Sequence, residues 1–87
     1  MDKEDKVFVK EYNKRWLQIG SHLIRKEQII SVYTDLSVKC IVTGKKIWII
    51  KIVLKNGNDL RLEEKEFKSE KDALSVCQTI VDLISVH

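Results

Sequence analysis

The strongest hydrophobic pattern in the chain lies in residues 44–60, which read GKKIWIIKIVLKNGNDL. Residues 47–55 are rich in β-branched side chains and predict a strand. The Asn-Gly pair that follows predicts a type I′ hairpin turn, because both residues accept the positive φ angles that this turn requires. Residues 60–67 predict the partner strand, with Leu60 and Leu62 pointing inward.

Shorter runs on the N-terminal side show a similar composition. We expect strands over residues 15–20, 29–35 and 38–43, where apolar and β-branched residues alternate with polar ones. Two further segments are open between alternatives. Residues 7–12 suit an extra edge strand or a short helix, and residues 22–28 suit an extended path or one helical turn.

The C-terminal part of the chain changes to the three- and four-residue spacing of a helix. The Ser69 hydroxyl can accept from a free N–H group of the first turn, and Glu70 and Asp72 place negative charge at the positive end of the helix dipole. The apolar positions that share one face are Ala73, Val76, Cys77, Ile80, Val81 and Ile84. Residues 69–86 therefore predict an amphipathic helix that is long enough to cross a small sheet.

These elements predict a single domain over residues 1–87 of the α+β class. Residues 15–67 form an antiparallel meander of four to five strands, the helix over 69–86 packs on it, and residues 1–6 are frayed. The chain has no Gly/Ser-rich linker and no repeat, so we expect no internal domain boundary.

The order of short strands, hairpin and terminal helix resembles small pleckstrin-homology-like modules of bacteria and phages. The resemblance covers most of residues 15–87 and is carried by WLQIG, IISVY, IVLKNGNDLRLEE and the final helix. It implies a curled sheet that forms a partial barrel, and a role in binding proteins or lipids rather than in catalysis.

The central strand has two apolar faces, although one helix can cover only one of them. One face carries Trp48, Ile50, Ile52 and Leu54, and the other carries Ile47, Ile49 and Val53. Three explanations for the second face are open. The N-terminal segment covers it within the monomer, two copies of the chain cover it in a homodimer, or another protein docks on it.

The charge of the chain is unevenly distributed. Residues 1–62 hold 13 Lys/Arg and 7 Asp/Glu, a balance of +6, whereas residues 63–87 hold 3 and 6, a balance of −3. A basic sheet surface with Tyr12, Trp16 and Tyr33 as stacking platforms could bind single-stranded nucleic acid. No basic run exceeds two residues, which favours ordinary surface charge instead.

Candidate chemistry is sparse. Cys40 and Cys77 suit buried apolar positions better than a redox pair, and His22 and His87 have no ligands at metal-binding spacing. The acidic run in residues 63–67 is most simply a solvated face, because an exposed strand end supplies no cleft for acid–base work. We therefore expect no catalysis, no metal and no cofactor.

The location follows from two further observations. The N-terminus has no apolar signal-peptide core, and Lys51 interrupts the longest apolar run, so we expect no transmembrane segment. Two cysteines without a secretory signal indicate a reducing, cytoplasmic setting.

The sequence predicts a non-enzymatic protein–protein interaction module that acts as an adaptor, an inhibitor or an accessory protein. Its partner is another protein or a second copy of the chain. The alternative is a nucleic-acid-binding protein that uses the basic sheet surface. The expected contact residues are Ile41, Ile47, Ile49 and Val53 as an apolar patch, with Lys45, Lys46, Lys51 and Lys55 as its rim.

Overall fold

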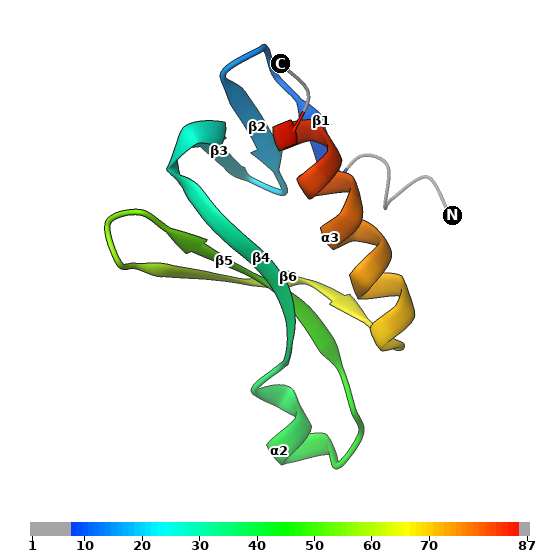
Figure 1. Cartoon of the computed structure of the whole chain (residues 1–87). Coiled ribbons are helices and arrows are strands. Elements are labelled where there is room, and N and C mark those ends of the chain that lie inside the picture. Colours follow the sequence, from blue (N-terminus) through cyan, green and yellow to red (C-terminus); the bar gives the residue numbers. More distant parts are fainter. Residues whose placement is uncertain (1–7, 86–87) are drawn as a thin grey trace.

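The computed structural model describes residues 8–85 and folds them into two antiparallel sheets with one long helix beside them (Figure 1). The first sheet has the order β1-β2-β3, formed by Val9–Glu11, Trp16–Ile19 and His22–Arg25. The second has the order β4-β5-β6, formed by Ile29–Leu36, Trp48–Leu54 and Asp59–Phe67. The remaining elements are the 3-10 turn η1 (Lys26–Gln28) between the sheets, α2 (Lys39–Thr43) and α3 (Glu70–Ser85).

The predicted α+β class and the C-terminal helix are confirmed. The strands are divided between two sheets, and residues 7–12 contribute the edge strand β1. Residues 22–28 combine both alternatives, since β3 is followed by one 3-10 turn. The prediction that residues 1–6 are frayed, and the last predicted helical residue, lie outside the part of the chain that the structure describes.

The prediction of a strand over residues 38–43 is wrong, because this segment contains the short helix α2. Leu36 at the end of β4 pairs with Trp48 at the start of β5, so the chain must reverse its direction between them. A strand that continued β4 would run away from Trp48. A helical turn capped by Gly44, which has a φ of 71°, turns the chain back.

The predicted type I′ turn between β5 and β6 is also wrong. In residues 8–85 no residue other than glycine has a positive φ, and Gly57 has a φ of 87°. The Gly57 N–H donates to the Leu54 carbonyl at 3.0 Å, and the Leu54 N–H donates to the Asn58 carbonyl at 3.0 Å. This is the three-residue loop in which a turn without positive φ is followed by a left-handed glycine.

One hydrophobic core joins the two sheets to α3. The predicted inner face of β5 is confirmed, because Ile50 and Ile52 are fully buried and Trp48 and Leu54 pack at the margin of the core. The first sheet contributes Phe8 just before β1, together with Val9, Leu17, Ile19 and Ile24. The helix contributes Ala73, Val76, Cys77 and Ile80.

An irregularity in β6 lets its acidic residues contact both the first sheet and the loop that contains α2. Trp48 pairs with Phe67 but Ile50 pairs with Leu62, so the strand bends away from β5 over residues 63–66. The Glu64 carboxylate accepts hydrogen bonds from the Ser21 N–H and hydroxyl, both at 3.2 Å. His22 Nε2 lies 3.1 Å from the same carboxylate, so Glu64 ties the turn between β2 and β3 to the second sheet.

The outer face of the second sheet is covered by polar side chains. Arg61 on β6 pairs with Asp35 on β4 at 2.7 Å, and the register of the strands takes this ion pair across β5 beside Ile49. Arg61 also contacts Glu63 at 3.1 Å. Ile49 is fully buried on this face. Side chains of the sheet itself therefore shield the outer surface of its central strand.

The ion pair of Asp35 predicts an acid-sensitive contribution to stability. The Arg61 guanidinium, together with the N–H of Leu36, holds the pKa of the Asp35 carboxyl below its ordinary value of 3.8. The stabilisation is present above that value and is lost as the pH falls through the lowered pKa of the folded state. We expect the difference in unfolding free energy between the wild-type chain and Asp35→Asn to shrink as the pH falls below about 4.

Urea unfolding at a series of pH values measures this difference. Equal dependence of both proteins on pH down to the acid limit of folding would contradict the assignment.

Candidate functional site

The loop between β4 and β5 is held at its base by specific hydrogen bonds. The Ser37 N–H donates to the Ile47 carbonyl at 2.8 Å, and the Ile47 N–H donates to Cys40 Sγ at 3.1 Å. The buried Ser37 hydroxyl donates to Glu63 at 2.9 Å, and Lys39 pairs with Glu66 at 2.7 Å. The base of the loop is therefore fixed to β6 by two of the carboxylates in its irregular stretch.

The short helix α2 projects from this base with its apolar side in solvent. Val38, Ile41 and Val42 follow helical spacing and share one face. Ile41 is 89% exposed and Val42 is 87% exposed, and Leu36 at the end of β4 is also exposed. Figure 1 shows α2 at the end of the molecule that lies away from α3 and the first sheet. We call Leu36, Val38, Ile41 and Val42 the apolar tip.

The segment that contains the apolar tip also carries three lysines, which we call its basic rim. Residues 36–47 contain Lys39, Lys45 and Lys46 and no acidic residue, so the segment carries a charge of +3. Lys45 and Lys46 are exposed, and neither forms an ion pair within residues 8–85. The segment thus combines exposed apolar side chains with exposed lysines, a combination found at macromolecular contacts.

The structure separates the expected contact residues into three groups. Ile41, Lys45 and Lys46 lie at the tip, with Ile47 half-buried at its base.

The second group lies on the outer face of β5. Lys51 pairs with Asp59 at 3.1 Å, and its ammonium lies 5.6 Å from the centre of the Tyr33 ring. Val53 is half-buried, and Ile49 is inaccessible to a partner while the sheet is intact. Lys55, in the loop at the opposite end of β5, forms the third group. The predicted continuous patch is therefore not assembled, and only its first group is a projecting surface.

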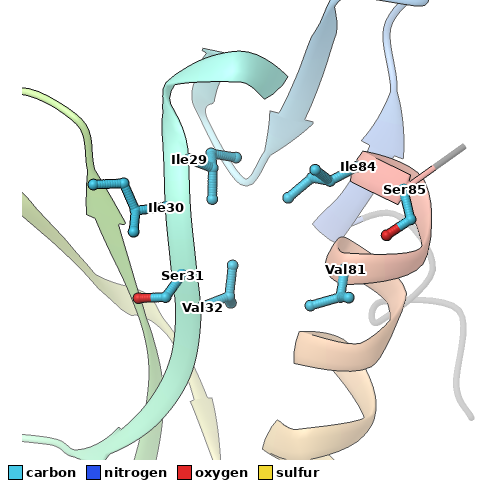
Figure 2. A pocket seen from close by; sticks show the side chains of 7 residues that line it. All are labelled: Ile29, Ile30, Ser31, Val32, Val81, Ile84 and Ser85. Carbon is cyan, nitrogen blue, oxygen red and sulfur yellow. The ribbon is translucent and has the colours of Figure 1, made fainter. Parts of the chain in front are cut away.

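A second apolar feature, which the sequence did not predict, lies between β4 and the last turns of α3. It is a groove of about 120 Å³ (Figure 2). Ile29 and Val32 point into it from the strand, and Val81 and Ile84 point into it from the helix. The volume suits one aliphatic side chain and lies well below the ~300 Å³ at which small-molecule sites begin. Alternation alone did not indicate it, because a β-bulge at Ile30 shifts the register of β4.

The remaining reactive side chains do not converge on a site. Cys77 lies on the buried side of α3, where burial raises the pKa of its thiol to about 11. Cys40 is half-buried under the tip, and both cysteines are free. Within residues 8–85 no group of three His, Cys, Asp or Glu side chains could hold a metal ion. No helix in the same range is long and apolar enough to cross a membrane.

Comparison of this chain with protein-family models, with curated proteins and with solved structures finds no match.

The contrast between Ile49 and Ile41 gives a test of the site. We expect Ile49→Ala to lower the unfolding free energy by about 2–5 kcal/mol, because it leaves a cavity in a fully buried position. We expect Ile41→Ala to change it by less than ~0.5 kcal/mol, because Ile41 is in solvent. Urea unfolding monitored by tryptophan fluorescence measures both. Equal losses in the two variants would show that the tip is part of the core.

Proposed function

We propose that this chain is a non-enzymatic protein-interaction module that docks on its partner through the apolar tip. The observation that carries the proposal is the near-complete exposure of Ile41 and Val42 on a helix whose base is fixed by hydrogen bonds. Exposed apolar side chains are unfavourable in water by about 25 cal/mol per Å². A tip that is held rigid loses little conformational entropy on binding, which favours affinity.

The charges on the rest of the surface support a protein partner over nucleic acid. Many of the cationic side chains already form ion pairs within the chain. Lys26 pairs with Glu11, Arg25 pairs with Glu27, and Lys51 pairs with Asp59.

The contacts of the aromatic rings also favour a protein partner over nucleic acid. The Arg25 guanidinium lies 5.8 Å from the centre of the Trp16 ring, and Lys51 lies over Tyr33. Two of the three aromatic rings that would stack on bases are therefore in contact with cations of the chain itself.

The proposed family is that of the pleckstrin-homology-like binding modules. The support for it is the sequence of short antiparallel strands in two sheets followed by one C-terminal helix. The proposed setting is the cytoplasm, which suits two free cysteines.

Site-specific photocrosslinking tests the proposed function. The photoreactive amino acid p-benzoylphenylalanine replaces Ile41, which is 89% exposed, in one version of the chain and Tyr12, which is 62% exposed, in a control. After irradiation in host cells and nuclease treatment, we expect a discrete protein adduct from position 41 and none from position 12. Adducts with nucleic acid alone, or equal labelling from both positions, would overturn the proposal.

A substitution at the tip provides a quantitative test. We expect Ile41→Asp to weaken binding to the crosslinked protein by roughly tenfold or more, because it places a charge at the centre of the contact. The same substitution should leave the thermal unfolding midpoint nearly unchanged. Titration of the purified partner, followed by fluorescence anisotropy, measures the affinity of both proteins.

A further inference from the structure

The two edges of the second sheet differ in their protection against pairing. β6, at one edge, carries six charged side chains, at positions 59, 61, 63, 64, 65 and 66. β4, at the other edge, contains neither lysine, arginine nor proline, and its one acid, Asp35, pairs with Arg61. Natural sheets normally block a free edge with charge, proline or a bulge. The bulge in β4 lies at Ile30, which leaves residues 31–36 in regular register.

The apolar groove runs along this unprotected edge. Four consecutive residues of β4, at positions 29–32, line it together with Val81, Ile84 and Ser85 of α3. Side chains of a regular strand alternate between its faces, and the bulge at Ile30 interrupts that alternation here. In Figure 2 Ile29 and Val32 point toward α3, and Ile30 and Ser31 point away from it, so the groove lies between the edge strand β4 and the last turns of α3.

The same strand leads directly into the apolar tip. The groove lies at the start of β4, and the tip begins at its end with Leu36. The exposed apolar side chains Ile30, Tyr33 and Leu36 are spread along the strand between these two features. One side of the molecule therefore presents, in order, an apolar groove, a free strand edge and an apolar projection.

The charges at the two ends of this surface are complementary. Lys45 and Lys46 lie beside the tip without an ion pair in residues 8–85, whereas the last turns of α3 beside the groove carry one charged residue, Asp82, and neither lysine nor arginine. Asp82 follows Val81, which lines the groove. An antiparallel copy of the surface would bring the lysines of each tip toward Asp82 of the other copy.

We propose that the partner at this surface is a second copy of the chain, which pairs β4 with β4 in antiparallel orientation about Tyr33, so that Tyr33 of one copy lies directly opposite Tyr33 of the other. The two sheets then form one continuous sheet, and the contact is isologous, so that each copy supplies both a tip and a groove. Leu36 of one copy lies opposite the start of β4 in the other. The tip that follows covers the groove between Ile29 and Ile84.

This inference rests on the proposed docking role of the tip and identifies its partner. A different protein would need only one apolar pocket for the tip. A second copy covers the groove, the strand edge and the tip in a single contact, and it accounts for the opposite charges at the two ends of the surface. The chain alone thus provides every element that the contact requires.

Sedimentation velocity of the purified chain over a wide concentration range tests the proposal. We expect a shift from the 10.2 kDa monomer to twice that mass as the concentration rises. Ile30→Lys places a charge on the free edge near the basic rim of the other copy, and we expect it to raise the dissociation constant at least tenfold. Ile30→Glu removes the same apolar side chain but introduces a negative charge, so it should weaken the dimer less than Ile30→Lys does. Tyr12→Lys is a control, because Tyr12 is 62% exposed and Ile30 is 61% exposed.

Oxidative crosslinking locates the two-fold axis. Tyr33→Cys should form a disulfide between two copies, because directly opposed residues of an antiparallel pair lie within disulfide reach. Tyr12→Cys should not, and peptide mapping separates the new bond from Cys40 and Cys77. A wild-type chain that stays monomeric at every concentration, or a dimer that Ile30→Lys leaves intact, would overturn the inference. A monomeric chain that still gives a protein adduct from position 41 would overturn the dimer while leaving the proposed function in place.

Discussion

The arrangement of this small fold depends on the carboxylates in the irregular stretch of β6. Glu64 holds the turn between β2 and β3, and Glu63 and Glu66 hold the base of the tip. Because β6 leaves its regular register between Leu62 and Phe67, these neighbouring residues can point to opposite parts of the molecule. The structure within residues 8–85 thus gains its connections between sheets from side chains rather than from a continuous ladder of backbone hydrogen bonds.

The core, the polar outer face and the exposed apolar side chains therefore lie in different parts of the fold. α3 and the inner faces of both sheets form the core, and the crossing ion pair of Arg61 and Asp35 covers the outer face of β5. Of the ten exposed large apolar side chains in residues 8–85, six lie along β4 and at the tip that follows it, and the other four are Tyr12, Leu23, Leu74 and Val81. Shielding one face with salt bridges therefore leaves an edge and an end of the sheet as accessible apolar surface, because the broad outer face is already covered by polar groups.

The parts of the fold that depend on local periodicity could be predicted from the sequence. The two-residue alternation of β5 and the helical stripe of α3 identified the core, because both patterns record which side of an element is buried. Residues 38–43 were predicted as a strand because their β-branched composition suits one. The helical signal was weaker, because it consists only of Ser37 and Gly44 on either side of the segment. The acidic run of β6 looked like a solvated face because the partners of Glu63 and Glu64 lie 26 and 43 positions away. The burial of Ile49 depends on a contact between two flanking strands, which no window of neighbouring residues contains.

The buried thiol of Cys77 gives this chain an internal reporter of its own dynamics. Only the thiolate form of cysteine reacts rapidly. Burial on the inner side of α3 both shields the Cys77 sulfur from solvent and keeps it protonated. Its alkylation therefore requires the helix to lift from the sheets, so the rate of labelling measures how often that opening occurs. Cys40 lies half-buried beneath the tip, in a different part of the fold, and its labelling reports on that loop instead. The labelling rates of Cys77 and Cys40 consequently measure local unfolding in two different regions of the molecule.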